Sequence, residues 1–290
     1  MGGYLIAVDG GGSTCRAALA ARDGRILARG RAGPANIATD PVQARASIGE
    51  AARAAIADAG LPPETIRDCA ALLGLAGARQ AAPTAAALLG DLPFSRTELT
   101  GDAEIALEGA LGPGDGIMAI LGTGSAFLAR HGGEIRSVGG WGLHLADQGG
   151  GARLGRDALR AALLARDGVR PHGPLSRTLL AAFDDDPARI VTFAGTARPA
   201  DFGRFAPHVF DAVAAGDPEA AGLLTTAVAE VSQMIAHLDW ADRPRIALMG
   251  GLAPLYARHL PAGMRERLSD PLGDALDGAV RLALRIFART

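Results

Sequence analysis

Short apolar runs alternate with longer amphipathic segments along the first hundred residues. The predicted strands span residues 4–8, 17–21, 26–29, 69–73 and 96–99. Helices are predicted at residues 40–60, 81–89 and 103–111. Asp40 can cap the first of these helices, Pro41 suits its first position and Gly60 can close it. Strands alternating with helices in this way are typical of an α/β fold.

The strand pattern of the first half recurs after a turn-rich segment at residues 112–116. Strands are predicted at residues 117–121, 126–129 and 134–138, and a helix follows at 152–164. The chain is then mostly helical from 175 to 240, before a strand at 245–249, a helix from Pro254 and a last helix at 273–288. We therefore predict two domains, residues 1–112 and 113–273, with the C-terminal helix in 274–290 as a candidate to join the first.

Two turns rich in glycine and hydroxyl residues stand at matching places in the two halves. The first consists of Gly10, Gly11, Gly12, Ser13 and Thr14 after Asp9, and the second of Gly122, Thr123, Gly124 and Ser125. Backbone N–H groups and hydroxyls in such turns can cradle a phosphate, and Asp9 is placed to hold a hydrated Mg²⁺. Either turn alone could be an ordinary hairpin. Their recurrence favours two phosphate-binding turns that face each other across a cleft.

The composition narrows the chemistry, because all 29 basic residues are arginine and the chain has no lysine. A Walker A loop, a protein kinase and a pyridoxal-phosphate enzyme each need a lysine, so these classes are excluded. A dinucleotide-binding glycine motif is disfavoured, since Cys15 stands where a third glycine or an alanine is expected. Any nucleotide chemistry must therefore use backbone amides, hydroxyls and Mg²⁺.

Net charge, hydropathy and cysteine content limit the classes of partner and the cellular compartment. The formal net charge of −2 argues against a general nucleic-acid binder, and no apolar run is long enough to span a membrane. The distant Cys15 and Cys69 suggest neither a disulfide framework nor a metal knuckle. We expect a cytoplasmic protein that acts on a small molecule.

Several polar residues have both a structural and a functional interpretation. Asp102 follows a predicted strand, so it is either the N-cap of the next helix or a reactive carboxylate at the sheet edge. Asn36 is either a turn residue or a ligand for a polyol. Asp147 is either a solvated turn residue or the group that grips a ligand in a glycine-rich segment. Gly250 and Gly251 suit either a tight turn or a nucleotide contact at a helix start.

Five motifs in fixed order resemble the actin/sugar-kinase/heat-shock-ATPase superfamily. They are DGGGST, GDAEIAL, LGTGS, GGWGLHLADQGGG and MGGLAP, and they extend through nearly the whole chain. Within that superfamily, the chain most resembles the N-acetylglucosamine/glucosamine kinases of the BadF/BadG/BcrA/BcrD ATPase group. The resemblance implies two ribonuclease-H-like domains that close on ATP and an amino sugar, and a homodimer.

The same resemblance implies roles for individual residues. Asp102 takes the place of the catalytic base, Asp9 has the Mg²⁺ role, and Gly250 with Gly251 matches the adenosine turn. The two glycine–hydroxyl turns match the two phosphate loops. Asn36, Gly77, Trp141 and Asp147 fall where the family contacts or shapes the sugar site. Gln148 and Gly149 depart from the family pattern, because many relatives have an acid followed by a serine or alanine there, so the role of Gln148 stays open.

The function expected on these grounds is ATP-dependent phosphorylation of glucosamine or N-acetylglucosamine at the 6-hydroxyl, with Asp102 as general base. The alternative is an ATPase of the same family without a sugar acceptor, which activates another enzyme. Such relatives carry cysteines that hold an iron–sulfur cluster between subunits. Here Cys15 lies inside the first turn and Cys69 in a predicted buried strand, so the kinase is favoured. A sugar-responsive regulator is the third and weakest interpretation.

Overall fold

The computed structural model describes residues 3–78 and 90–288 of the chain. It divides into two compact units, which are described separately: Met1–Gly114 with Pro271–Thr290, and Asp115–Asp270. The predicted helix at residues 81–89 lies outside the described residues. In the part of the chain that is described, no helix combines the length and the hydropathy needed to cross a membrane.

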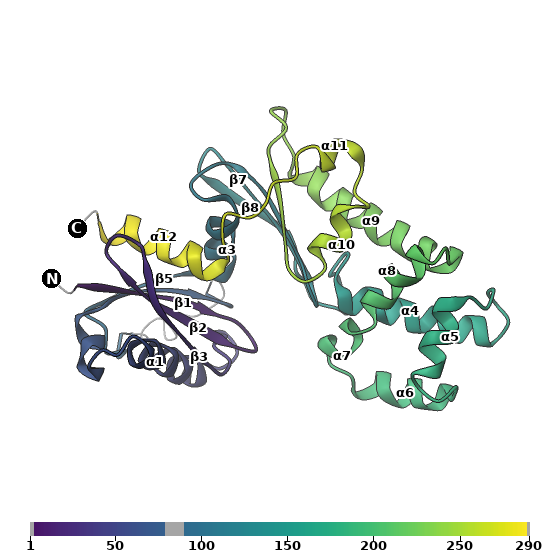
Figure 1. The fold of residues 1–290 in the computed structure, drawn as a ribbon, viewed down its shortest axis with the longest axis horizontal. Coiled ribbons are helices and arrows are strands. Elements are labelled where there is room, and N and C mark those ends of the chain that lie inside the picture. Colours follow the sequence, from purple (N-terminus) through teal and green to yellow (C-terminus); the bar gives the residue numbers. More distant parts are fainter. Residues whose placement is uncertain (1–2, 79–89, 289–290) are drawn as a thin grey trace. The chain divides into compact units, whose positions relative to one another are not determined.

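The first unit is built on a five-stranded mixed sheet (Figure 1). Its strands are β1 (Tyr4–Gly10), β2 (Cys15–Ala21), β3 (Ile26–Ala32), β4 (Ala70–Leu75) and β5 (Arg96–Gly101). The order across the sheet is β3-β2-β1-β4-β5, with β1 antiparallel to β2 and parallel to β4. This is the order of a ribonuclease-H-like sheet, and all five predicted strands are confirmed.

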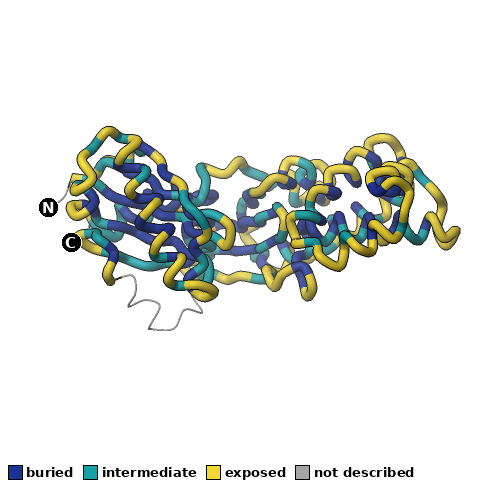
Figure 2. Tube along the Cα trace, turned by 90° about the horizontal axis from the view of Figure 1, so that it is seen from below, coloured by how far each residue is buried: buried dark blue, intermediate teal, exposed yellow. Residues whose placement is uncertain are grey.

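Residues 4–8 of β1 are all apolar because helices cover both faces of the sheet. Ile6 and Val8 face a core with helix α1 (Pro41–Asp58), whereas Leu5 and Ala7 face a second core with the C-terminal helix α12 (Ala275–Phe287). Figure 2 shows the resulting run of buried residues along the strands. A strand buried on both faces reads as a continuous apolar run rather than an alternating one.

The remaining elements of the first unit are the short helix η1 (Pro63–Asp68) and helix α3 (Asp102–Leu111). Helix α1 is capped as predicted: the Asp40 side chain accepts a hydrogen bond from the N–H of Gln43, and Pro41 is the first helical residue. Helix α3 begins one residue earlier than predicted, because its N-cap is Gly101.

Helix α12 crosses α3 at two glycines. A Cβ on Gly109 would lie 2.1 Å from the carbonyl oxygen of Asp274, and a Cβ on Gly278 would lie 2.0 Å from that of Ile105. The backbones therefore touch with no side chain between them. The same two helices are also joined by an ion pair, in which the guanidinium of Arg285 donates to both carboxylate oxygens of the buried Glu108, at 2.6 and 2.9 Å.

The second unit repeats the first in its strands. β6 (Gly116–Leu121), β7 (Ser125–His131), β8 (Glu134–Gly139) and β9 (Ile246–Met249) form a sheet in the order β8-β7-β6-β9. This order matches β3-β2-β1-β4 and confirms the predicted repeat. In the place of β5, the described residues have a single parallel bridge between Ile246 and Leu268.

Helices make up most of the second unit between β8 and β9. They are α4 (Gly151–Arg166), α5 (Pro174–Ala181), α6 (Pro187–Thr196), α7 (Pro199–Gly203), α8 (Ala206–Ala214) and α9 (Pro218–Leu238), and α10 (Ala253–Ala257) and α11 (Ala262–Arg265) follow β9. The predicted start of α9 is confirmed, since the Asp217 side chain accepts from the N–H groups of Glu219 and Ala220. Phe127 of the sheet and Val231 of α9 belong to the core that these helices share.

The glycine crossing generates a stability prediction. Gly278→Ala would force a methyl group against the backbone of α3, and overpacking of this kind costs about 1–3 kcal/mol. We expect a lower free energy of unfolding in urea for this variant. Gly49→Ala is the matched control, because it also lies inside a helix and its new Cβ would meet only the flexible end of Arg53, at 3.3 Å. Equal losses in the two variants would contradict the close crossing.

Candidate functional site

The carboxyl ends of three parallel strands gather acidic residues at one edge of the first sheet. The register aligns Asp9 on β1 with Gly74 on β4, and Gly74 with Thr100 on β5. Asp102 stands two residues beyond Thr100. A Cβ on Gly74 would lie 2.4 Å from Ile105, so the glycine lets α3 approach the sheet. Loop and strand ends at this edge are where α/β proteins place their chemistry.

Asp102 is the first residue of α3 rather than its N-cap, so the capping interpretation is wrong by one residue. Its Oδ1 accepts a hydrogen bond of 2.9 Å from the N–H of Ala103. Burial raises the pKa of the Asp102 carboxyl, the hydrogen bond from Ala103 opposes this, and the negative charges of Asp9 and Glu104 raise it further. The net shift of the pKa is upward, and perturbed carboxyl pKa values of this kind are concentrated at functional sites.

Asp9 is held by an arginine that the sequence analysis did not single out. Arg16 lies directly opposite Asp9 in the antiparallel pairing of β1 with β2. Its Nη2 and Nε donate to Oδ2 of Asp9 at 2.6 and 3.1 Å, and its Nη1 donates to Oδ2 of Asp274 at 2.8 Å. The sequence did contain a signal for the contact between Arg16 and Asp9, because in a hairpin the two residues stand equally far from the turn. No pattern among neighbouring residues could have revealed the contact between Arg16 and Asp274.

The first glycine–hydroxyl turn joins β1 to β2 as a hairpin. The N–H of Gly11 donates to the carbonyl of Thr14 at 2.9 Å, and the loops after β3 and β4 bind its start through the N–H groups of Ala35 and Ala76. Ser13 is exposed. The turn is therefore fixed at its base and open at its tip.

The glycines of this turn differ in what they do for the fold. A Cβ on Gly10 would lie 2.6 Å from the buried Leu75 and 3.0 Å from Ala35, so packing excludes a side chain there. A Cβ on Gly12 would meet nothing within 4 Å, and its φ angle is not one that requires glycine. The fold thus accounts for Gly10 but not for Gly12.

Asn36 and Gly77 lie against each other beside this turn. The Asn36 Oδ1 accepts from the N–H groups of Ala38 and Thr39, at 3.0 and 3.1 Å, so its carbonyl serves a local turn. Gly77 has a φ of +80°, and a Cβ there would lie 2.7 Å from that same oxygen. The side-chain oxygen of Asn36 therefore acts as a turn acceptor, in agreement with the interpretation of Asn36 as a turn residue. The close approach of this oxygen and the positive φ explain why residue 77 is glycine.

The second glycine–hydroxyl turn lies at the matching edge of the second sheet. The N–H groups of Gly151 and Ala152, at the start of α4, donate to the carbonyls of Gly122 and Thr123 at 2.8 Å each. The Ser125 hydroxyl is buried and has no hydrogen-bond partner. Beside the turn, Gly250 has a φ of +93°, and a Cβ on it would lie 2.4 Å from the carbonyl of Leu121. Gly251 follows it, and a Cβ there would meet nothing within 4 Å.

Asp147 joins the second turn from the loop before α4. It is 7 % exposed and has a φ of +59°, a left-handed conformation that is rare for residues other than glycine. A Cβ on Gly124 would lie 2.8 Å from its Oδ2, and its Oδ1 accepts from the N–H of Gly142 at 3.2 Å. A solvated turn acid would need neither the burial nor the strain, so that interpretation is wrong.

The neighbours of Asp147 are both unusual. The Oε1 atom of Gln148 is buried without a hydrogen-bond partner. Gly149 has a φ of +73°, and a Cβ there would lie 2.2 Å from Val231, which explains the departure from serine or alanine at this position. On the same loop, the indole of Trp141 is 76 % exposed.

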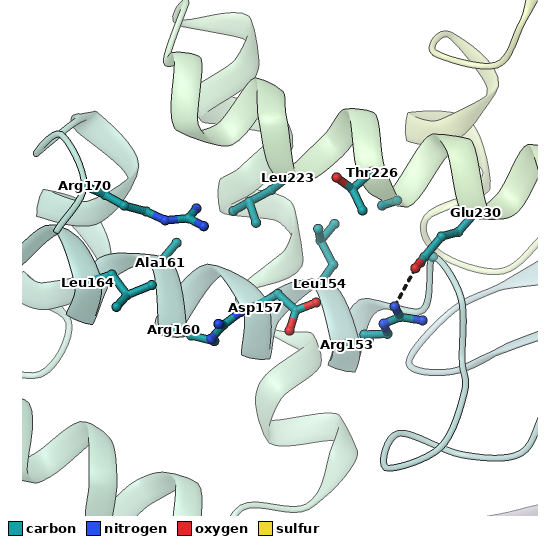
Figure 3. A pocket seen from close by; sticks show the side chains of 12 residues that line it. Arg153, Leu154, Asp157, Arg160, Ala161, Leu164, Arg170, Leu223, Thr226 and Glu230 are labelled. Carbon is teal, nitrogen blue, oxygen red and sulfur yellow. Dashed lines mark hydrogen bonds and ion pairs between the residues drawn. The ribbon is translucent and has the colours of Figure 1, made fainter.

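A cavity of about 190 Å³ lies between α4 and α9, with Gly149 at its border (Figure 3). Its polar lining is mixed in charge: the guanidinium of Arg153 pairs with Glu230 at 2.5 Å, and Arg170 pairs with Glu219. The lining combines Arg153, Arg160 and Arg170 with the carboxylates of Asp157 and Glu230, so its charge is mixed rather than concentrated. It contains none of the predicted site residues.

The carboxylate of Asp9 fits a magnesium ion that is shared with a ligand. Among the described residues, no group of three His, Cys, Asp or Glu could hold a metal by itself. Mg²⁺ in nucleotide sites is usually bound by one or two carboxylates, several waters and substrate phosphates. Both bonds from Arg16 go to Oδ2 of Asp9, so Oδ1 is the oxygen suited to the ion.

The structure thus brings the predicted residues together in two groups, one in each unit. Asp9, the first turn, Asn36, Gly77 and Asp102 surround the edge of the first sheet. The second turn, Asp147, Gln148, Gly250 and Gly251 surround the edge of the second, with Trp141 on the adjoining loop. Arg16 and Asp274 are the additions that the structure makes to these groups.

Comparisons with known proteins agree with this architecture. The model of the BadF/BadG/BcrA/BcrD ATPase family matches residues 6–268. Glucosamine kinase GspK of Vibrio cholerae is 34% identical over 280 residues, which cover 97% of this chain and 95% of that protein. A solved structure from Chromobacterium violaceum, described as a candidate N-acetylglucosamine kinase, has a TM-score of 0.87 and 37% identity, covering 98% of this chain and 99% of that one.

A more distant solved structure shares the fold alone. The ROK family glucokinase of Streptomyces griseus, in complex with glucose and AMPPNP, has a TM-score of 0.57 and 19% identity, covering 98% of this chain and 100% of that one.

The environment of Asp102 generates a prediction about stability and pH. A carboxyl whose pKa is raised by folding stabilises the protein while it is protonated, and this contribution is lost as the pH rises through its folded pKa. Asp102→Asn keeps the acceptor for Ala103 and removes the charge. We therefore expect the variant to have a higher melting temperature than the wild type at neutral pH, with the difference shrinking in acid.

The control is Asp58→Asn, which makes the same chemical change at an exposed position. Melting curves from pH 4 to pH 8 by circular dichroism would provide the comparison. A difference between Asp102→Asn and the wild type that does not depend on pH would contradict the proposed environment.

Proposed function

Because the chain belongs to the BadF/BadG/BcrA/BcrD ATPase family, we propose that it is an ATP-dependent kinase that phosphorylates glucosamine or N-acetylglucosamine at the 6-hydroxyl. The observation that carries this proposal is the position of Asp102. It is a half-buried carboxylate with a raised pKa, at the sheet edge that also bears Asp9 and the first glycine turn. The named functions of the two most similar relatives described above support the choice of an amino sugar.

Asp102 acts as the general base in this mechanism. An alcohol is a poor nucleophile, so Asp102 accepts the proton of the 6-hydroxyl as the oxygen attacks the γ-phosphorus of ATP, and the bond to the ADP oxygen breaks. The hydrogen bond from Ala103 occupies Oδ1 of Asp102 and orients the carboxylate. Positioning and charge stabilisation supply most of the remaining catalysis in phosphoryl transfer.

The glycine–hydroxyl turns bind the phosphates of ATP. In the first turn, the open tip with Gly12, Ser13 and Thr14 offers backbone N–H groups and hydroxyls. In the second turn, the buried hydroxyl of Ser125, which lacks a partner in the protein, is suited to a phosphate oxygen. Gly250 and Gly251 receive the adenosine. Since the chain has no lysine, these neutral donors take the role that a P-loop gives partly to a lysine.

Asp9 is the residue that would hold Mg²⁺, through Oδ1. A bound Mg²⁺ would neutralise charge on the phosphates as the γ-phosphoryl group moves. In the same mechanism, Asn36, Gly77, Trp141 and Asp147 bind or shape the sugar. Asp147 contributes a buried carboxylate suited to sugar hydroxyls. Gln148 contributes an acceptor that has no protein partner.

The general-base role predicts the kinetics of Asp102→Asn. We expect kcat to fall by roughly 10²–10⁴, the usual range for removal of a general base, because the amide cannot accept the proton. Sugar binding, measured by calorimetry, should remain close to that of the wild type. Asp58→Asn serves again as the matched control and should retain full turnover. A wild-type kcat for Asp102→Asn would remove Asp102 from this role.

The contrast between two glycines tests the phosphate cradle. We expect Gly12→Ala to keep the wild-type free energy of unfolding, since the new Cβ would meet nothing within 4 Å. It should bind Mg²⁺-ATP roughly tenfold or more weakly, because the methyl group would keep the phosphate from the backbone N–H groups, whose hydrogen bonds to a charged ligand contribute about 1.5–3 kcal/mol each. Gly10→Ala should instead lose about 1–3 kcal/mol of stability through overpacking. Unchanged ATP affinity in Gly12→Ala would show that this turn is only a hairpin.

A further inference from the structure

We propose that Arg16 is a positioning residue that fixes the carboxylate of Asp9 for the divalent metal, and that Asp274 at the start of the C-terminal helix holds Arg16 in place. The inference rests on the metal-binding part of the proposed function. It adds to that function a residue on β2 and a residue near the end of the chain, neither of which contacts the metal.

The two edges of the Arg16 guanidinium bind two different carboxylates. One edge, with Nε and Nη2, donates to Oδ2 of Asp9 at 3.1 and 2.6 Å. The other edge, with Nη1, donates to Oδ2 of Asp274 at 2.8 Å. Because the guanidinium is planar and rigid, fixing one edge fixes the direction of the other. Asp274 therefore sets the orientation in which Arg16 meets Asp9.

The contact with Arg16 gives the two carboxylate oxygens of Asp9 different roles. Both hydrogen bonds go to Oδ2, which prevents the carboxylate from rotating and leaves Oδ1 as the oxygen for the metal. Mg²⁺ requires a nearly ideal octahedral geometry, so a freely rotating carboxylate is a weaker ligand than a fixed one. Partners that orient a ligating group in this way commonly contribute 10–100-fold to metal affinity.

The positive charge of Arg16 also reduces the repulsion among the carboxylates at this sheet edge. The carboxylates of Asp9 and Glu104 both act on Asp102, so three acidic groups share one sheet edge. The neighbouring carboxylates of Asp9 and Asp274 outweigh the effect of burial and keep the pKa of Arg16 above its ordinary value. Arg16 thus remains a cation throughout the physiological range and offsets part of the repulsion.

Asp274 uses separate oxygens for its two tasks. Its Oδ1 accepts from the N–H of Asp277 at 2.9 Å and caps α12, whereas its Oδ2 binds Arg16. Burial raises the pKa of Asp274, but the hydrogen bond from Asp277 and the charges of Arg16 and Arg29 outweigh this and lower it. Asp274→Asn can therefore keep the cap while replacing the oxygen that faces Arg16 with an amide.

Arg29 provides a matched control. Its guanidinium lies 3.9 Å from Oδ2 of Asp274 and 3.2 Å from Oδ1 of Asp277, so it pairs with the same helix start. It makes none of the contacts that Arg16 makes with Asp9. If the effect of Arg16 came only from the stability of α12, Arg29→Ala would reproduce it.

The experiment measures metal binding without turnover. Mn²⁺ is titrated into the full-length protein with ADP and no sugar, and bound Mn²⁺ is read by electron paramagnetic resonance for the wild type and for the Arg16→Ala, Arg16→Lys, Asp274→Asn and Arg29→Ala variants. ADP binding in EDTA is measured in parallel by calorimetry. Arg16→Lys keeps the charge but loses the fork, so it keeps the test informative if Arg16→Ala does not fold.

We expect Arg16→Ala to weaken Mn²⁺ binding by about 10–100-fold, with ADP binding in EDTA little changed. Arg16→Lys and Asp274→Asn should shift Mn²⁺ binding in the same direction by smaller factors, and Arg29→Ala should match the wild type. Equal Mn²⁺ affinity in the wild type and folded Arg16 variants would overturn the inference, as would an equal loss in Arg29→Ala. A weakened Mn²⁺ site in a protein that phosphorylates no sugar would support the inference while refuting the proposed function.

Discussion

The crossing of α12 over α3 is the contact on which the first unit depends. At Gly109 and Gly278 the two helices touch through their backbones, so the position of one helix sets that of the other. Helix α3 begins with Asp102, and α12 begins beside Asp274. The two helices therefore place the proposed base and the partner of Arg16 at the same sheet edge. Asp274 thus joins Asp9, Arg16 and Asp102, which lie more than 170 residues earlier in the chain, at this one edge.

The electrostatics of that edge follow from the same arrangement. Parallel strands bring Asp9 and Asp102 together because their carboxyl ends meet at one side of the sheet. Burial raises the pKa of Asp102, and repulsion from the carboxylates of Asp9 and Glu104 raises it further. The same repulsion disfavours the folded state. A chain without lysine supplies the compensating cation as an arginine, whose forked shape also allows it to bind Asp274.

The sequence predicted the parts of the fold that depend on local signals. The strands, the caps at Asp40 and Asp217, and the repeat of the strand order were all confirmed, because apolar runs and capping residues act within a few positions of each other. The interpretation of Asp102 as the N-cap was wrong because α3 starts at Asp102 and is capped by Gly101, whereas its role as a reactive carboxylate stays a prediction. That start differs from the predicted one by a single residue.

Other features could not be predicted because they join distant parts of the chain. The contact of Arg16 with Asp274 spans 258 residues and has no periodicity that would reveal it. The requirement for glycine at position 149, in the loop before α4, comes partly from Val231 on α9. Asp147 was a candidate from its glycine-rich surroundings, yet its burial and left-handed backbone are visible only in the structure.

The release of ADP from Mg²⁺-ATP tests the central claim most directly. It should be measured with glucosamine, with N-acetylglucosamine, with 6-deoxyglucosamine and without sugar. The account predicts strong stimulation by at least one of the first two, with one phosphorylated sugar formed for each ADP, and no stimulation by the 6-deoxy sugar. Equal ADP release with and without sugar would contradict the account and identify an ATPase that has no sugar acceptor.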